Sequence, residues 1–282
     1  WGSGSDDDAE QASRQAFTTS VQAGINLIDT AEVYGMGRAE HLLGQFVHET
    51  GDPVIVASKF MPFPWRLTKG SLRRALQGSL RRLGRDRVDL YQIHWPTPPV
   101  AIDTWMDAMA DVVEAGLVRA VGVSNYSVAQ MRQAHAALSK RGIPLASNQV
   151  LYNLLKRGPE ETGLLAVCRE LDVRLIAYSP LAQGLLTGKY SPENPPAGFA
   201  RRRQQTPLLA RIQPLVDRMR SIGEAHEGKT PAQVALNWTI CKGSLPIPGA
   251  RNARQASQNA GATGWRLTAD EVAALDEAAA RV

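Results

Sequence analysis

The sequence predicts an α/β fold, a (β/α)8 TIM barrel that forms one domain over residues 1–282. Short apolar, β-prone segments alternate with amphipathic helical segments, which predicts a parallel sheet. The strand segments are almost continuously apolar, as in sheets whose two faces are both covered. Polar residues end nearly every strand segment. An open doubly wound sheet carries such residues only at its switch point, so the pattern favours a barrel with a functional rim.

Seven strand segments are expected, and each ends in or just before a turn. They are 25–31, 53–60, 89–95, 118–125, 145–150, 174–180 and 245–250. Helical segments lie between them, for example 71–84, 103–116 and 128–142. The clearest helix is 71–84, in which four leucines share one face and arginines take the other: Leu72, Leu76, Leu80 and Leu83.

An eight-stranded barrel needs one more strand, which should precede the expected helix Asp7–Ala23. Only WGSGS stands there, so we expect the first strand and its hairpin to be absent from this chain. Either the natural protein begins earlier or its barrel closes in another way. A long loop is expected at about 184–206, carrying several prolines and the run Arg201–Arg203. Its length indicates a functional or mobile segment.

The composition is that of an ordinary soluble protein, with 44% hydrophobic residues, 21% charged residues and a net charge of +5. This mild positive charge suits an anionic ligand such as a phosphate-bearing cofactor. The basic residues are spread along the chain, so we expect no nucleic-acid partner. Cys168 and Cys241 have no zinc-binding spacing and are expected to be buried thiols. No membrane span or signal peptide is predicted, which indicates the cytoplasm, or the plastid stroma if the source is a plant.

Four polar residues at or just beyond the ends of the first three strand segments form a candidate catalytic group. They are Asp29, Tyr34, Lys59 and His94. A phenol has a pKa of about 10, and a neighbouring ammonium group lowers it by favouring the phenolate. An aspartate holds such a lysine charged and oriented, and a histidine can orient a carbonyl oxygen beside the phenol. This set of groups predicts protonation of a carbonyl oxygen on which negative charge develops.

Each of the four residues also has a structural interpretation when taken alone. Asp29 can end a strand or form a turn, His94 can be a packed histidine, and Lys59 can follow a strand for no catalytic reason. The catalytic interpretation depends on their occurrence together.

The sequence resembles the aldo-keto reductase family over essentially its whole length. The matching segments, in order, are DTAEVYG, VIVASKF, LYQIHW, GVSNYS, ASNQVLYN, IAYSPLAQGLLTGKY and IPGARNARQASQNAGA. Within the family it is most similar to the plant, cyanobacterial and bacterial branch that includes pyridoxal reductases. The resemblance implies an eight-stranded barrel and an NADPH-dependent oxidoreductase that reduces aldehydes and ketones.

The resemblance also implies a role for individual residues. Tyr34 matches the proton donor, Lys59 and Asp29 the pair that tunes it, and His94 the residue that orients the substrate. The residues that match the family's cofactor contacts are Ser124, Asn125, Gln149, Tyr178, Ser179, Pro180, Leu181, Gln183, Lys189, Gly249, Arg251, Gln255, Gln258 and Asn259. A helix N-terminus after 249 would suit a phosphate, and Arg251 favours NADPH over NADH.

The sequence departs from the family pattern at two places. The N-terminal strand, which touches cofactor or substrate in the family, has no counterpart here. Gly249–Ala250 stands where many members have a Lys-Ser pair, which leaves the adenosine contacts open. Met61, Phe63, Trp65 and Trp95 follow catalytic strands and either line the substrate pocket or pack at the rim.

Two other functions are alternatives to a carbonyl reductase. An NADPH-binding regulatory or redox-sensing subunit with slow turnover would resemble the channel β subunits, but there an asparagine replaces the residue matching His94. A metal-dependent barrel hydrolase would need several rim histidines. Only His94 ends a strand segment, so no metal site is expected.

Overall fold

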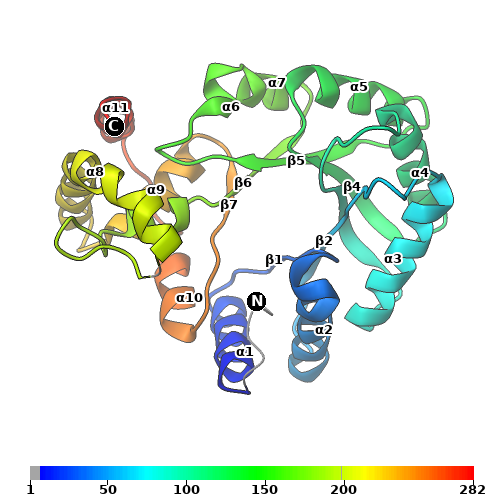
Figure 1. Ribbon diagram of the computed structural model, residues 1–282, viewed down its shortest axis with the longest axis horizontal. Coiled ribbons are helices and arrows are strands. Elements are labelled where there is room, and N and C mark those ends of the chain that lie inside the picture. The colour runs from blue at the N-terminus through cyan, green and yellow to red at the C-terminus, as the bar shows by residue number, and fades with distance from the viewer. Residues whose placement is uncertain (1–6, 198) are drawn as a thin grey trace. The chain divides into compact units, whose positions relative to one another are not determined.

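The computed structural model describes residues 7–197 and 199–282, without the side chains of 199–205 (Figure 1). The chain forms two compact units. The first comprises the described residues of Trp1–Val150 with Pro159–Ile176 and Ala250–Ala256; the second comprises Leu151–Gly158, Ala177–Gly249 and Ser257–Val282. The expectation of one domain over 1–282 remains a prediction.

The strands fall where the sequence pattern predicts them. They are β1 (Leu27–Asp29), β2 (Ile55–Phe60), β3 (Val88–Ile93), β4 (Val118–Ser124), β5 (Leu145–Leu151), β6 (Arg174–Tyr178) and β7 (Leu245–Ile247). They form one sheet in chain order, and β1 to β5 pair in parallel. Sequential order with parallel pairing follows from the helical crossover after each strand.

The helices of the first unit cover the outer face of its strands, as Figure 1 shows for α2 to α5. Leu72, Leu76, Leu80 and Leu83 on α3 are all buried, which confirms the predicted amphipathic face. The helical elements are α1 (Asp7–Gln22), η1 (Tyr34–Gly37), α2 (Arg38–Thr50), α3 (Lys69–Leu83), α4 (Ile102–Glu114), α5 (Val128–Ser139), α6 (Gly158–Glu161), α7 (Leu164–Glu170), η2 (Ala182–Thr187), α8 (Phe199–Ala225), α9 (Pro231–Cys241), α10 (Ala253–Ala260) and α11 (Ala269–Ala280).

The segment 184–206 differs from the expected loop. It holds most of η2 and the first residues of α8, which begins at Phe199. Arg201–Arg203 therefore lie on a helical backbone, because arginine and glutamine favour helices and the prolines at 192, 195 and 196 all precede Phe199. Their side chains lie outside the described residues, as does the WGSGS segment.

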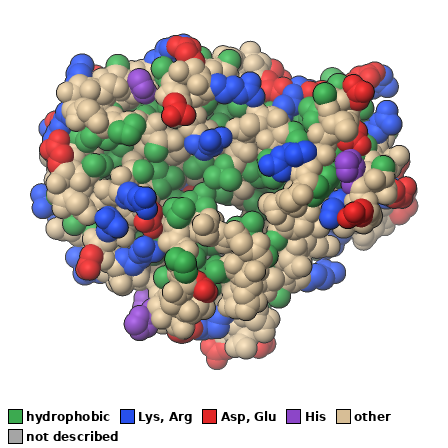
Figure 2. All heavy atoms as spheres, turned by 180° about the vertical axis from the view of Figure 1, so that it is seen from behind, with side chains coloured by type: hydrophobic (Ala, Val, Ile, Leu, Met, Phe, Trp, Pro, Cys, Tyr) green, Lys and Arg blue, Asp and Glu red, His purple; other side chains and the backbone are tan. Residues whose placement is uncertain are grey.

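Other expectations from composition can be compared with the structure. No helix in the described part of the chain is long and apolar enough to cross a membrane. Cys168 is buried as predicted, whereas Cys241 is only partly buried. On the face shown in Figure 2, Lys and Arg side chains are interspersed with Asp and Glu side chains. The exclusion of nucleic acid remains a prediction.

Candidate active site

The carboxyl ends of three neighbouring strands bring the predicted catalytic residues together in the first unit. Asp29 is the last residue of β1, Lys59 stands next to the end of β2, and His94 follows β3 directly. Parallel pairing places these ends at the same edge of the sheet, with the backbone N–H of His94 donating to the carbonyl oxygen of Phe60 at 2.9 Å.

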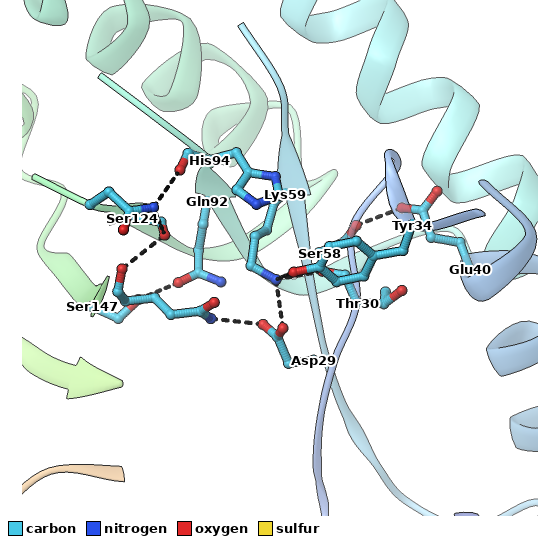
Figure 3. A network of polar contacts seen from close by, with 12 residues as sticks. Asp29, Thr30, Tyr34, Glu40, Ser58, Lys59, Gln92, His94, Ser124 and Ser147 are labelled. Carbon is cyan, nitrogen blue, oxygen red and sulfur yellow. Dashed lines mark hydrogen bonds and ion pairs between the residues drawn. The ribbon is translucent and has the colours of Figure 1, made fainter. Parts of the chain in front are cut away.

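Lys59 is the centre of the group and is fully buried (Figure 3). Its Nζ lies 2.5 Å from Asp29 Oδ2, 2.8 Å from the carbonyl oxygen of Thr30 and 3.5 Å from the hydroxyl oxygen of Tyr34. Burying an ammonium group is costly unless it is paired and hydrogen-bonded. The carboxylate and the carbonyl offset that cost, and the longest of the three contacts directs the remaining positive charge at the phenol.

Tyr34 projects from a tight turn between β1 and α2. Its side chain is 39% exposed, so the hydroxyl faces buried Lys59 on one side and can be reached from solvent. The next two residues have left-handed backbone angles, with φ of 56° at Gly35 and 52° at Met36. A left-handed methionine is strained, and such strain is found where a fold must hold a side chain in one place.

His94 completes the group. Its ring lies edge-on to the Tyr34 ring at a centroid distance of 5.9 Å and an interplanar angle of 83°. Burial, followed by the nearby Lys59 ammonium, lowers the pKa of His94 from 6.5 to about 4. The imidazole is therefore neutral near pH 7. Its buried Nδ1 has no hydrogen-bond partner among the described residues.

A hydrogen-bond chain connects these residues to three of the predicted cofactor-binding residues. Gln149 Nε2 donates to Asp29 Oδ1 at 2.8 Å, and Ser124 Oγ donates to the Gln149 carbonyl at 2.8 Å. Asn125 Nδ2 donates to Ser124 Oγ at 3.1 Å and to the His94 carbonyl at 3.2 Å. One continuous polar network thus joins the ends of β1 to β5. Amide side chains carry both a donor and an acceptor, which suits recognition of a carboxamide.

A second polar layer behind Lys59 was not predicted. Ser58 Oγ donates to Glu40 Oε1 at 2.5 Å, and Arg82 Nε donates to Glu40 Oε2 at 2.7 Å. Glu40 is fully buried although its helix α2 has an exposed face. The position of Glu40 within the apolar stripe of α2 is a sequence signal for this layer. A carboxylate buried there needs a cationic partner.

The second unit contains the residues expected at the cofactor pyrophosphate. Tyr178 ends β6, and Pro180 and Leu181 precede η2. Four residues here have left-handed backbone angles, with φ of 51° at Ser179, 47° at Ala182, 56° at Gln183 and 96° at Gly184. Turns of this kind group backbone N–H donors into anion-binding concavities. Lys189 follows this turn, with its ammonium group 5.4 Å from the centre of the Tyr190 ring.

The residues expected at the adenosine end lie around the start of α10. The backbone N–H of Arg251 donates to Gln255 Oε1 at 2.9 Å, and that of Gln255 donates to Asn252 Oδ1 at 3.0 Å. Asn259 Nδ2 donates to the Gly249 carbonyl at 3.3 Å, and Gln258 is on the same helix. A Cβ at Gly249 would meet no atom within 4 Å, so the chain passes through open space there. These residues form three local hydrogen bonds rather than one continuous network.

The described ranges, 7–197 and 199–282, contain no group of three or more His, Cys, Asp or Glu residues placed to hold an ion. The absence of a metal site remains a prediction.

Comparisons with known proteins identify the family. The model of the "Aldo/keto reductase family" matches residues 1–280. Pyridoxal reductase, chloroplastic, of Arabidopsis thaliana is 44% identical over 280 residues, covering 94% of this chain and 76% of that protein.

Solved structures are similar to the chain across almost its full length. An aldo-keto reductase from Klebsiella pneumoniae in complex with NADPH aligns with a TM-score of 0.78 and 32% identity, covering 98% of this chain and 88% of that one. A glycerol dehydrogenase from Gluconobacter oxydans aligns with a TM-score of 0.86 and 30% identity, covering 100% and 88%. The predicted barrel class of fold is thereby confirmed.

Proposed function

The chain belongs to the aldo-keto reductase family of oxidoreductases, and we propose that it reduces aldehydes and ketones to alcohols with NADPH, with Tyr34 as the proton donor. The observation that carries the proposal is the buried Lys59 ammonium, which contacts Asp29 and the Tyr34 hydroxyl together. Small carbonyl compounds are the proposed substrates.

The residues present suit the cofactor. The amides of Asn125 and Gln149 can recognise the nicotinamide carboxamide. The N–H groups of Ala182 and Gly184 in the left-handed turn donate to carbonyls of the turn itself, which fixes its backbone ahead of Lys189, whose ammonium group can pair with a phosphate. Arg251 suits a phosphate on the ribose because its guanidinium forms forked hydrogen bonds. When bound, the nicotinamide supplies the hydride. The NADPH complex of the Klebsiella relative supports this choice of cofactor.

The protein side chains handle the proton. The Tyr34 hydroxyl donates to the carbonyl oxygen as negative charge develops there, and Lys59 stabilises the negative charge then left on the phenol oxygen. Asp29 and the Thr30 carbonyl accept hydrogen bonds from the Lys59 ammonium group and hold it in place. His94 is neutral, so it orients the carbonyl oxygen by hydrogen bonding and places no second cation beside Lys59.

The relatives indicate which carbonyl to test first. The 44% identity with a pyridoxal reductase makes pyridoxal the first candidate substrate. A nitrobenzaldehyde and a short aliphatic ketone extend the test to other carbonyl classes.

The test is NADPH consumption, followed by absorbance, with these three substrates and with Tyr34→Phe alongside. We expect wild-type turnover with at least one aldehyde and a loss of about 100- to 10,000-fold in Tyr34→Phe, because general acids contribute that much. NADPH affinity should stay within about threefold, since the phenol acts on the carbonyl. Wild-type turnover in Tyr34→Phe would rule out Tyr34 as the acid. NADPH binding without any turnover in the wild type would instead favour a regulatory or redox-sensing subunit.

A further inference from the structure

We propose that Glu32 and Arg66 are positioning residues that fix Trp65 as a stacking surface for the planar aromatic part of the carbonyl substrate. The inference rests on the proposed function and deepens it, because it names a substrate class. Neither Glu32 nor Arg66 belongs to the predicted catalytic or cofactor-binding residues.

The first observation is a forked ion pair between the turn that carries Tyr34 and the loop that follows β2. Arg66 Nη1 lies 2.5 Å from Glu32 Oε1, and Arg66 Nη2 lies 3.0 Å from Glu32 Oε2. Glu32 stands between Asp29 and Tyr34 in the chain, and the loop holding Arg66 follows Lys59 and β2. The Glu32 and Arg66 side chains are only 9% and 21% exposed, so solvent screens this pair less than a surface pair.

The second observation is that both residues of the ion pair also form hydrogen bonds with the backbone of Met61, the first residue of the loop. The backbone N–H of Met61 donates to Glu32 Oε1 at 2.7 Å, and Arg66 Nη1 donates to the Met61 carbonyl at 2.9 Å. The backbone N–H of Arg66 donates to the Phe63 carbonyl at 2.8 Å. The loop from Met61 to Arg66 is thus bonded to Glu32, which lies two positions before Tyr34 in the chain.

The third observation is a stack of flat groups that leads from the core to the surface. The guanidinium carbon of Arg66 lies 5.0 Å from the ring centre of Phe60 and 5.2 Å from that of Phe63. Phe63 and Trp65 stack in parallel, with ring centres 4.7 Å apart and planes 5° apart. Phe60 is fully buried, whereas Trp65 is 73% exposed.

The Trp65 indole is exposed although its stack with Phe63 holds it in place, so its free face can bind a ligand. Leaving Trp65 largely in water forgoes the hydrophobic gain of burial, and aromatic rings stabilise each other when they stack in an offset, parallel arrangement. Trp65 belongs to the short loop that begins directly after Lys59 and β2. A planar aromatic carbonyl can stack on Trp65, while a short aliphatic carbonyl gains nothing there.

A double-mutant cycle tests whether Arg66 acts through Trp65. KM and kcat are measured for 4-nitrobenzaldehyde and for a short aliphatic ketone in the wild type, Trp65→Ala, Arg66→Met and the double variant. Trp65→Ala should raise KM for the aromatic aldehyde about fivefold to tenfold and leave KM for the ketone within about twofold. Arg66→Met alone should raise the KM for the aromatic aldehyde about threefold to fivefold. In the Trp65→Ala background the same substitution should change that KM by less than about twofold.

The matched control is Arg132→Met. Arg132 also forms a forked pair with a carboxylate of the first unit, with contacts to Glu170 of 2.8 and 2.6 Å, but both side chains are exposed. We expect both KM values to stay within about twofold, because exposed ion pairs contribute little. Arg66→Lys covers the case in which Arg66→Met does not fold, and it should raise the aromatic KM in the same direction because lysine cannot form the fork.

The outcomes separate this proposal from the proposed function. Tyr34→Phe should lower turnover of every substrate by about 100- to 10,000-fold, whereas these variants change the ratio of the two KM values. If the wild type turns over neither substrate, dissociation constants from calorimetry on the NADPH-saturated protein replace KM in the same cycle. The proposal is overturned if Trp65→Ala leaves that ratio unchanged, or if Arg66→Met raises the aromatic value equally with and without Trp65.

Discussion

Two regions with predicted functional residues are built in opposite ways. At the strand ends of the first unit, side chains are joined by hydrogen bonds from Asp29 through Gln149 and Ser124 to Asn125. In the second unit, the segment Ser179–Gly184 is distinguished by its backbone, which takes left-handed angles at four positions. The difference teaches that the proposed proton transfer depends on particular side chains at fixed distances, whereas the proposed phosphate site depends on how a strained turn holds its backbone.

The largest effect is expected when the side-chain network at the strand ends of the first unit is disrupted. Lys59→Met should lower turnover by about 100- to 10,000-fold, because it removes the charge beside Tyr34 and leaves Asp29 without its cation. Turnover is measured by NADPH consumption. Lys69→Met is the control, since Lys69 pairs with Asp107 on the surface, and it should change turnover less than about twofold. Equal losses in the two lysine variants would refute the special role of Lys59.

A smaller effect is expected when the backbone region is disturbed. Gly184→Ala should weaken NADPH binding about tenfold, because φ is 96° there and an added Cβ would lie 3.2 Å from Tyr190 Cε2. Gln183→Ala keeps the backbone and should weaken binding by less than about threefold. Affinities come from fluorescence titration with NADPH. A larger loss for Gln183→Ala than for Gly184→Ala would show that side chains, not the backbone, hold the phosphate groups.

The smallest effect concerns pH and His94. The pKa of His94 is about 4 in the folded protein and about 6.5 when unfolded. The unfolded state therefore binds the proton first as pH falls, so this contribution to stability is complete above about pH 6.5 and is lost between about 6.5 and 4. It is at most about 3 kcal/mol, and less because His94 is only partly buried.

The measurement is urea unfolding of the wild type and His94→Gln at several pH values. As pH falls from about 6.5 to about 4, the unfolding free energy of the wild type should decrease relative to that of His94→Gln. A difference that stays constant from pH 7 to pH 4 would contradict a depressed His94 pKa.

Much of this organisation was accessible from the sequence because it is local. Strand segments ending in Asp29, Lys59 and His94 predicted both the sheet and the residues that meet at its edge. The left-handed turn after Tyr178 could be located by its motif but not by its angles, since Ala182 and Gln183 are not residues that favour φ above zero.

What could not be predicted depends on contacts between distant segments. The Glu32–Arg66 pair joins residues on different loops, and nothing in PWR or DTAEVYG alone specifies that they meet. Glu40, Ser58 and Arg82 likewise come from α2, β2 and α3, and their pairing is fixed only by how those elements pack. The helix α8 begins at Phe199, inside the expected loop, because the arginine and glutamine run after the prolines favours a helix.

The most direct test of the central claim is the single-turnover rate of NADPH oxidation in Tyr34→Phe, Lys59→Met and the double variant. If Tyr34 and Lys59 act as one unit, the double variant should be no more than about threefold slower than the slower single variant, because residues that act together are non-additive. If the two losses multiply in the double variant, the residues act independently, and the proposed role of Lys59 in proton donation by Tyr34 is contradicted.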